Sequence, residues 1–588
     1  MRLIILLLIC LIGAGRAEEV FPRAGWQDRA DPIASSEAVP GGVLTLSGIQ
    51  SKSLNAYLDS YKTTQDIFGL MYESLLGLDP ITSEFVPGLA RRCVLSDDKR
   101  TFTFELDPAA RWSDGRPVTA ADVRWTFDAI MNPAHETGPN KVALEVFAPP
   151  EIVDAQTVRF KAREVHWRNL LAAGGFAVMP GHLFSNQDFN KINFSFPVVS
   201  GPYRLDSFRE NAEVRMERRP DWWARTRPST AGTFNFQTLV HRFFSEQDNA
   251  FESMRKGDID IHVVYTARIW ANETRGERFD RRWIVKQRVR NHNPIGFQGF
   301  AMNLRRPPFD DARVRQALAH LLDRETMNRT LMYNAYFMHK SYYEGLYDTA
   351  HPCTNRVFAF DPEEAGRLLQ AAGWAMNPKT GLRERDGRAL AVNFLTRDGS
   401  SDKFLALYAA DLRKAGVALK IDRKDAAAWM RDMDAFNFDM TWAAYGASRF
   451  PDPEYQWHSR EADRPAGNNV TGFKDARVDA LIERQRGEFD PGRRAELLRE
   501  IDAILTASVP YVLLWNIDNT RLLYWDKFGM PPTVLSKFGD ESAIVAYWWN
   551  DPDAAAELKA AMAAGETLPA RPEDVDFDKV FKGGAAGK

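Results

Sequence analysis

The sequence predicts an α/β protein with several layers and at least two lobes. Its 588 residues exceed the ~250–300 residues at which a single hydrophobic core stops growing. Segments of alternating apolar residues, typical of strands, recur between segments with apolar residues at helical spacing. The composition is that of an ordinary globular chain, with 45% hydrophobic and 26% charged residues, so we expect a sizeable core.

The first elements are expected early in the chain. Alternation of apolar and polar residues over 43–47 and 101–106 predicts two strands. A turn follows at residues 113–115, where the sequence is Ser-Asp-Gly. Thr119 and Asp122 then form a capping box, which predicts the start of a helix.

The later elements continue this pattern. Helical spacing predicts helices over 311–322, 478–482 and 497–505, and short strands are expected at 392–395 and 417–421. We find no repeat at a solenoid period and no low-complexity linker. The tail from Asp551 is Ala-rich and then polar and Gly-rich, which predicts a short surface helix followed by a disordered end.

The N-terminal residues are typical of a secretory signal. Arg2 provides the charged region, residues 3–12 the apolar run, and residues 15–17 the small residues of a cleavage site. We expect cleavage after Ala17 and an exported, periplasmic mature protein. The alternative is a lipoprotein modified at Cys10, but the preceding residue is Ile, where a small residue is normally found.

The net charge and the cysteine content argue against a nucleic-acid-binding protein and against a disulfide-rich fold. The formal net charge is −3, which argues against a nucleic-acid partner, because phosphate binding favours a basic surface. The cysteines after the signal are Cys93 and Cys353, and two cysteines so far apart are not a disulfide framework. They could form one bridge or remain two buried thiols.

The sequence lacks the common catalytic and metal-binding motifs. The sequence contains none of the phosphate-loop, G-x-S-x-G, H-E-x-x-H or C-x-x-C patterns, and its ten histidines are scattered. Acidic pairs at 97–98 and 310–311 precede turns or helix starts, where a capping role suffices. We therefore predict no enzyme activity, no cofactor and no metal site.

Four stretches carry a resemblance to a known family. They are Ser53–Tyr57 with Met71–Pro80 and Phe85–Ala90; Leu95–Phe104 with Arg111–Val123; Ser200–Tyr203 with Glu217–Trp223; and Met302–Asp310 with Val314–Leu318. In this order they resemble the family 5 extracellular solute-binding proteins, which serve ABC importers of dipeptides and oligopeptides. Within this family, residues 305–309, 234–236 and 462–467 resemble the YejA-like branch, which is associated with oligopeptide uptake.

The resemblance implies the large type II periplasmic-binding-protein fold, with an extra subdomain in lobe one and a ligand cleft between the lobes. The chain would leave lobe one near residues 296–302 and return near residues 515–521. The expected parts are a signal peptide (1–17), lobe one (18–295), lobe two (296–515), a return to lobe one (516–550) and a C-terminal helix with a flexible tail (551–588).

The most informative loop is 441–453. The resemblance implies an aspartate before its last proline that pairs with a peptide's α-amino group, but that register holds Arg449, or Ser448 with an insertion. Arg449 suits an anionic group, whereas the nearest carboxylate is Asp452. Structural roles stay open for both: a surface charge for Arg449 and a helix cap for Asp452. The candidate ligand-contacting residues are Trp442, Tyr445, Arg449, Asp452, Trp457, Asn468, Asn469, Trp515 and Asn516.

The predicted function is the substrate-binding component of an ABC importer, which captures an oligopeptide or peptide-like solute and delivers it to permease subunits in the inner membrane. We expect a monomer. Two alternatives remain open: a sensory binding protein that presents its ligand to a membrane receptor, and a secreted hydrolase of peptides or glycans.

Overall fold

The computed structural model describes residues 18–582, so the expected signal sequence and cleavage site lie outside the described residues. Contacts divide this part of the chain into two compact units. Unit 1 comprises residues 18–31, 48–231 and 237–245, and unit 2 comprises residues 32–47, 232–236 and 246–582. The lobe boundaries given by the resemblance stay a prediction.

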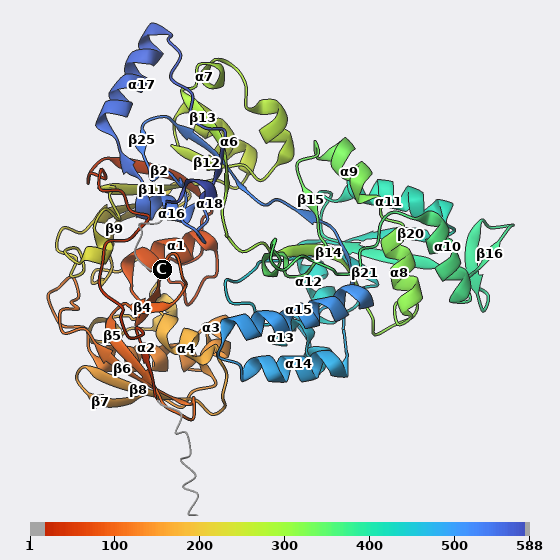
Figure 1. The fold of residues 1–588 in the computed structure, drawn as a ribbon, viewed down its shortest axis with the longest axis horizontal. Helices are drawn as coiled ribbons and strands as arrows, with labels where there is room; N and C mark the ends of the chain where they lie inside the picture. The colour runs from red at the N-terminus through yellow and green to blue at the C-terminus, as the bar shows by residue number, and fades with distance from the viewer. Residues whose placement is uncertain (1–17, 583–588) are drawn as a thin grey trace, which may run out of the picture. The chain divides into compact units, whose positions relative to one another are not determined.

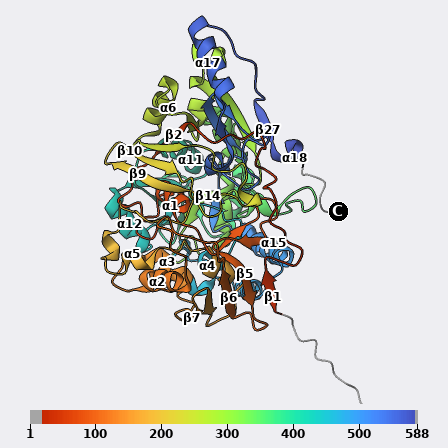
Figure 2. The same cartoon turned by 90° about the vertical axis from the view of Figure 1, so that its left-hand side faces the viewer.

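Unit 1 is built on a five-stranded antiparallel sheet, whose strands are visible in Figures 1 and 2. The strand order is β1 (Glu19–Phe21), β5 (Ala90–Leu95), β6 (Thr101–Leu106), β8 (Thr157–Lys161) and β7 (Glu151–Asp154). Three further strands of unit 1 pair in an antiparallel manner: β9 (Tyr203–Arg209), β10 (Glu213–Arg218) and β11 (Thr238–Phe243). A hairpin joins β3 (Leu76–Leu78) to β4 (Phe85–Pro87). The helices are α1 (Lys62–Met71), α2 (Ala120–Met131), α3 (Gly138–Leu144), α4 (Asn169–Gly175) and α5 (Gly181–Phe184).

The local predictions for unit 1 are confirmed. Strand β6 has the predicted bounds, and its alternating residues Phe102, Phe104 and Leu106 are buried. Helix α2 begins with the capping box: Asp122 accepts a hydrogen bond from the backbone N–H of Thr119 at 3.0 Å. The sequence predicted both features correctly because the alternation of β6 and the capping box of α2 each depend on residues only a few positions apart.

Unit 2 contains two principal sheets. One includes, as consecutive neighbours, β27 (Asp574–Asp576), β13 (Ile284–Arg290), β24 (Thr520–Trp525), β12 (Ile261–Val263) and β2 (Val43–Gly48). The other has the order β20 (Ala418–Arg423), β19 (Ala391–Thr396), β21 (Met440–Tyr445), β14 (Phe297–Met302) and β22 (Tyr511–Leu513). The chain passes from one sheet to the other between β13 and β14 and returns between β22 and β24, near the two crossings expected from the resemblance.

The smaller elements of unit 2 surround these sheets. The short strands form three groups: β15 (Phe337–Met338) with β23 (Trp515–Asn516); β16 (Ala375–Asn377), β17 (Leu382–Arg385) and β18 (Arg388–Ala389); and β25 (Phe528–Gly529) with β26 (Trp549–Asn550). The helices are α6 (Gln247–Lys256), α7 (Glu277–Asp280), α8 (Ala312–His320), α9 (Arg324–Leu331), α10 (Pro362–Ala371), α11 (Asp402–Lys414), α12 (Ala426–Asp434), α13 (Glu454–Trp457), α14 (Ala476–Arg486), α15 (Pro491–Ser508), α16 (Ser542–Tyr547), α17 (Pro552–Ala564) and α18 (Phe577–Val580). None of the helices in residues 18–582 has both the length and the hydropathy of a membrane span.

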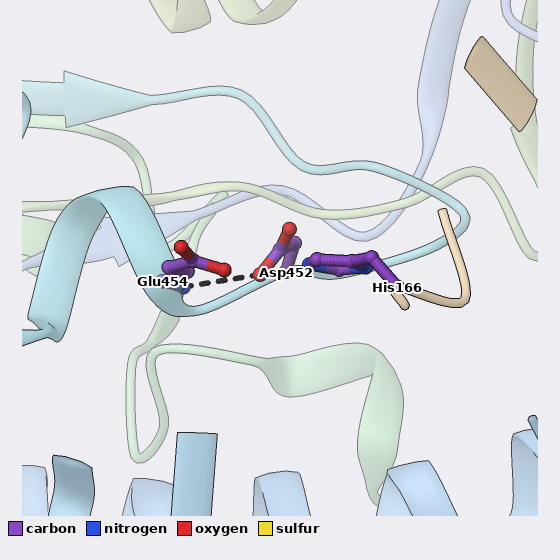
Figure 3. A group of neighbouring side chains, drawn as sticks. All are labelled: His166, Asp452 and Glu454. Carbon is purple, nitrogen blue, oxygen red and sulfur yellow. Dashed lines mark hydrogen bonds between the residues drawn. The ribbon is translucent and has the colours of Figure 1, made fainter. Parts of the chain in front are cut away.

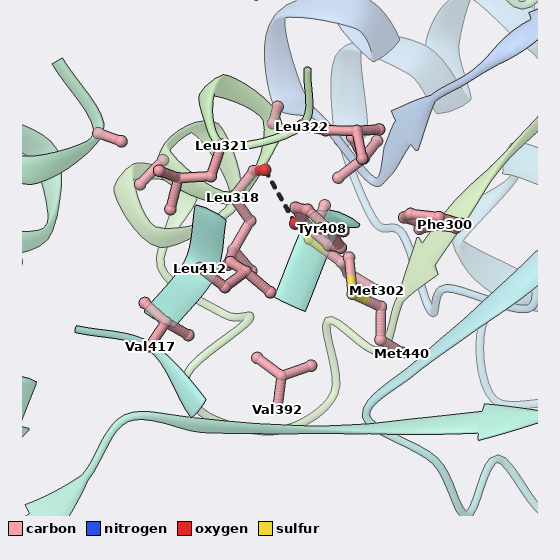
Figure 4. Close-up of a cluster of buried hydrophobic side chains, with 14 of the residues drawn as sticks. Phe300, Met302, Leu318, Leu321, Leu322, Val392, Tyr408, Leu412, Val417 and Met440 are labelled. Atoms are coloured by element: carbon pink, nitrogen blue, oxygen red, sulfur yellow. Dashed lines mark hydrogen bonds between the residues drawn. The ribbon is translucent and has the colours of Figure 1, made fainter. Parts of the chain in front are cut away.

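A large apolar cluster fills the space between the second sheet and helices α8 and α11. Figure 4 shows Phe300 and Met302 from β14 facing Tyr408 and Leu412 from α11. The Tyr408 hydroxyl donates to the Leu318 carbonyl at 2.9 Å, which satisfies the one polar group that this ring buries. The cluster packs against β14 and β21, and β21 carries the candidate ligand residues Trp442 and Tyr445.

The C-terminal segment differs from the sequence prediction. Helix α17 is present as expected, but the following residues, expected to be disordered, include β27, which pairs in parallel with β13, and helix α18. Gln287 donates to the Pro572 carbonyl at 2.8 Å, and Val575 and Phe577 are buried. Those two apolar residues anchor a segment whose overall composition is polar.

Cys93 and Cys353 are both free thiols.

Candidate functional site

Two candidate regions emerge, one in each unit. The unit 2 region lies on β14, β21 and β23, where Gln298 connects two of the predicted residues. Its side-chain oxygen accepts a hydrogen bond from Trp442 Nε1 at 3.0 Å, and its side-chain nitrogen donates to the Trp515 carbonyl at 2.8 Å. The two tryptophan rings meet edge to face with centroids 5.9 Å apart. The structure therefore brings Trp442 and Trp515 together, with Trp515 3% exposed and Trp442 partly exposed.

A second aromatic group on the same strands contains Tyr445. Its ring stacks on Phe297, with centroids 5.1 Å apart, and its hydroxyl lies 3.0 Å from that of Tyr511. Burial raises the pKa of Tyr445, so its hydroxyl stays protonated and is available as a hydrogen-bond donor or acceptor. Trp457 belongs to this group but has 0% of its surface exposed, and its indole N–H donates to the Tyr343 hydroxyl at 3.0 Å. A ligand could stack on Trp457 only if its neighbours moved.

Gly296, just before β14, lies close to the backbone at the end of β21. A Cβ at this position would overlap the Tyr445 carbonyl oxygen, so only glycine fits without backbone movement. Asn516 donates from its side chain to the Gly296 carbonyl at 2.8 Å. Asn516 is thus held against the start of β14, and its side chain joins the outgoing and returning segments.

Among the described residues, Arg449 has an aromatic neighbour and no acidic partner. Its guanidinium carbon lies 4.4 Å from the centroid of the Phe538 ring, and burial lowers its pKa. Within residues 18–582, no carboxylate oxygen lies within 4.0 Å of its side-chain nitrogens. A guanidinium supported on one face by an aromatic ring and left without a counter-ion suits an incoming anionic or carbonyl group.

The hydrogen bonds of Asp452 and Asn469 indicate structural roles for these two residues. Asp452 accepts a hydrogen bond from the backbone N–H of Glu454 at 3.1 Å, at the beginning of α13 (Figure 3), as expected of a cap. Asn469 is fully buried, donating to the Phe473 carbonyl at 2.9 Å and accepting from its N–H at 3.0 Å. Asn468 is exposed. The two hydrogen bonds favour a structural role for Asn469, and the exposure of Asn468 makes it a surface residue.

Sequence reasoning missed the region in unit 1, a cavity of about 490 Å³ beside α1, α3 and β3. That volume lies in the range of small-molecule sites, ~300–1,000 Å³. Its polar lining includes Tyr57, Gln65, Glu73 and Asn140, and its apolar lining includes Phe68. Asn140 donates to the Tyr57 carbonyl at 3.4 Å, and the Gln65 side chain holds the Ala56 carbonyl at 3.0 Å.

Glu73 is the charged group of this cavity, and tryptophans bind it. Trp222 Nε1 donates to one carboxylate oxygen at 3.3 Å and Trp223 Nε1 to the other at 2.7 Å. The Glu73 backbone N–H donates to the Ser200 hydroxyl at 3.0 Å. Burial raises the Glu73 pKa to about 7, although these hydrogen bonds and the nearby Arg219 act in the opposite direction. The first and third resembling stretches thus converge on one carboxylate.

Comparison with known protein families shows the family to which the chain belongs. Residues 84–467 match the bacterial extracellular solute-binding proteins, family 5, and the chain belongs to this family. It is therefore a non-enzymatic binding protein with the α/β fold of that family, and the predicted fold class, family branch and lack of enzymatic activity are confirmed.

Relatives cover almost the whole chain. The uncharacterized protein YejA of Escherichia coli (strain K12) is 25% identical over 93% of this chain and 94% of its own. The peptidoglycan-binding protein YepA of Agrobacterium fabrum is 26% identical over 88% of this chain and 92% of its own. The fold also matches the oligopeptide-binding protein AppA of Bacillus subtilis, solved with a nonapeptide, with a TM-score of 0.66 and 20% identity over 87% of this chain and all of that one.

Proposed function

We propose that this chain is the substrate-binding component of an ABC import system and that its solute is an oligopeptide or a peptide-like molecule. The observation that carries the proposal is the cavity of about 490 Å³ in unit 1, in a chain that belongs to a solute-binding family. Its lining combines an aromatic surface with amide and carboxylate groups, which suits a ligand with alternating apolar side chains and backbone hydrogen-bonding groups.

The ligand-contacting residues proposed in unit 2 are Trp442, Tyr445, Arg449 and Asn516. Trp442 and Tyr445 provide partly exposed aromatic surface. Arg449 provides a cation that has no carboxylate partner within residues 18–582. A ligand with a free carboxylate or a carbonyl-rich end would satisfy Arg449 through charge-assisted hydrogen bonds. The names of two compared proteins, which mention peptidoglycan and a nonapeptide, agree with peptide chemistry.

The proposal includes location and partners. We infer a periplasmic protein, because an expected signal sequence precedes the described residues and the family is extracellular. The partners would be the peptide and the permease subunits in the inner membrane, and the protein would act as a monomer. The ligand cleft between lobes implied by the resemblance remains part of this proposal.

The test is equilibrium dialysis against a defined pool of three- to six-residue peptides, with mass spectrometry of both chambers. We expect selected peptides to be retained and released intact on denaturation. Retention of none would contradict the peptide class, and shortened peptides in either chamber would instead support a hydrolase. Peptide uptake by cells with and without the gene then separates import from sensing.

A further inference from the structure

The charged groups in the lining of the unit 1 cavity are of one sign. Among the described residues that form this lining, Glu73 is the one acid, and none is an arginine, lysine or histidine. Arg219 is a cation close enough to act on Glu73, but it is 2% exposed and lies 3.2 Å from a carboxylate oxygen of Asp221. Because Arg219 is balanced by Asp221, the lining is negative when Glu73 is ionised.

The two amide side chains of the lining use their nitrogens inside the protein. Gln65 Nε2 donates to the carbonyls of Ala56 and Asp59, both at 3.0 Å. Asn140 Nδ2 donates to the Tyr57 carbonyl at 3.4 Å. These carbonyl partners fix the orientation of both amides, because a carbonyl oxygen needs a donor opposite it. Gln65 Oε1 and Asn140 Oδ1 accept no hydrogen bond from residues 18–582, so both oxygens are left for a ligand.

The other polar side chains of the lining are also engaged within the protein. Three hydroxyls, those of Tyr57, Tyr72 and Ser74, donate to backbone carbonyls, those of Ala177, Val198 and Leu76. The Glu73 carboxylate accepts from the two indoles described above and hydrogen-bonds the Ser200 side chain, so it acts on a ligand mainly through its charge. Apart from the second N–H of Asn140, the described lining thus has side-chain acceptors to offer and no side-chain donor.

Aromatic rings form the rest of the recognition surface. Tyr57, Phe68, Tyr72 and Phe176 line the cavity. The Phe68 ring contacts Tyr57 and Tyr72, with centroids 5.5 and 4.9 Å apart, so three of the four rings form one continuous group. The face of an aromatic ring carries partial negative charge and attracts cations, which adds to the effect of the acceptor oxygens.

We propose that the unit 1 cavity binds a cationic nitrogen group of the solute, an ammonium or a guanidinium, whose N–H groups donate to Gln65 Oε1 and Asn140 Oδ1. This inference rests on the proposed function and adds to it the charge of the group that enters this cavity. An ammonium has three donors and a guanidinium five, and neither has an acceptor, so both match a lining of acceptors. A carboxylate would face acceptor oxygens and the charge of Glu73, which disfavours it.

Four tripeptides separate the two sources of such a group, the peptide's terminus and a basic side chain. They are Ala-Lys-Ala, Ala-Nle-Ala, in which norleucine keeps the aliphatic chain without the ammonium, and the N-acetylated form of each. Isothermal titration calorimetry measures their affinities for wild type, Asn140→Asp and Asn140→Lys. Asn140 is partly exposed in the first turn of α3, where an aspartate is favourable, so we expect both variants to fold.

The two variants should change affinity in opposite directions. For a peptide whose cation occupies the cavity, Asn140→Asp should strengthen binding and Asn140→Lys should weaken it, each about three- to tenfold. N-acetyl-Ala-Nle-Ala has no cation and should not respond. The matched controls are Asn186→Asp and Asn186→Lys, which change an exposed residue of unit 1 outside the lining and should leave all affinities unchanged. Binding of the cationic peptides without any response to the Asn140 variants would overturn the inference and leave the proposed function standing.

The closing experiment does not depend on peptide binding. Saturation-transfer NMR compares n-butylammonium with butyrate, a probe of opposite charge, on the whole protein. We expect saturation of n-butylammonium that Asn140→Lys reduces at least about threefold, Asn140→Asp increases and Asn186→Lys leaves unchanged. Equal n-butylammonium signals from wild type and Asn140→Lys, or a butyrate signal that Asn140→Lys increases from an already strong wild-type level, would overturn the cation site. If n-butylammonium behaves as expected and no peptide binds, the proposed function fails and the cation site remains.

Discussion

Glu73 in unit 1 and Arg449 in unit 2 show two different ways of holding a charged side chain. Both carboxylate oxygens of Glu73 accept hydrogen bonds from indole N–H groups of the protein itself. Arg449 rests on a phenylalanine ring and has no carboxylate within 4.0 Å in the described chain. A charge that the protein already satisfies mainly stabilises the fold, whereas a charge without a counter-ion is available to a ligand.

The largest effect is expected at Glu73. Glu73→Ala leaves the indole N–H groups of Trp222 and Trp223 without the acceptor they have here, which should lower the free energy of unfolding by roughly 2–4 kcal/mol. Glu73→Gln keeps one acceptor oxygen and should cost less. Urea denaturation of the three proteins measures this, and equal stability of wild type and Glu73→Ala would show that Glu73 has no structural role.

The second prediction concerns pH. The Glu73 pKa is raised from 4.5 to about 7, so the folded state binds this proton more tightly than the unfolded state. The stabilisation from the bound proton is complete below about pH 4.5 and is lost as pH rises through about 7, with a change of roughly 1–3 kcal/mol. Subtracting the pH profile of Glu73→Gln from that of wild type should isolate this slope, and parallel profiles would exclude the raised pKa.

The third prediction concerns ligand charge. Arg449→Ala should weaken binding of an acidic tripeptide such as Ala-Ala-Glu by about 10- to 100-fold, with little change in Tm. Amidating the peptide's carboxylates should weaken binding to wild type and leave Arg449→Ala unaffected. Isothermal titration calorimetry measures both.

Asp452→Asn is the matched control for Arg449→Ala. We expect it to keep the affinity, because Asp452 accepts from the backbone N–H of Glu454. If Asp452→Asn abolishes binding while Arg449→Ala has no effect, Asp452 anchors the ligand's amine and Arg449 is a surface charge. If neither variant changes binding, the specificity lies with Trp442, Tyr445 and the unit 1 cavity.

The smallest effect is expected at Trp442. Trp442→Phe keeps an aromatic ring beside Trp515 but removes the hydrogen bond to Gln298. The free energy of unfolding should fall by about 0.5–1.5 kcal/mol. A larger loss, measured by chemical denaturation, would mean that the Gln298 link holds β14, β21 and β23 together.

Sequence reasoning predicted the elements whose signals are local. The capping box at Thr119 and the alternation of β6 involve neighbours in the chain, and both have the expected geometry. The resembling stretches identified the family because they are packing motifs. For example, a Cβ at Gly201 would overlap the Leu70 carbonyl oxygen, so this turn requires glycine.

The candidate site was less predictable, because the side chains that contact one another in it come from distant parts of the sequence. The indoles that bind Glu73 lie 149 and 150 residues further along the chain. Tyr57 and Asn140, in the cavity lining, are separated by 83 residues. Trp457 could not be distinguished from an exposed aromatic residue, because its burial depends on the packing of Phe297, Tyr342 and Tyr511 around it.

Native mass spectrometry of the protein purified from its own cells tests the central claim most directly. If the chain is a peptide-binding protein, the spectrum should show a second species heavier by the mass of a small peptide. Fragmentation of the released ligand should give a peptide sequence, and Arg449→Ala should reduce the fraction bound. A ligand with no amide bonds, or a steady release of cleaved product from an added peptide, would contradict the account.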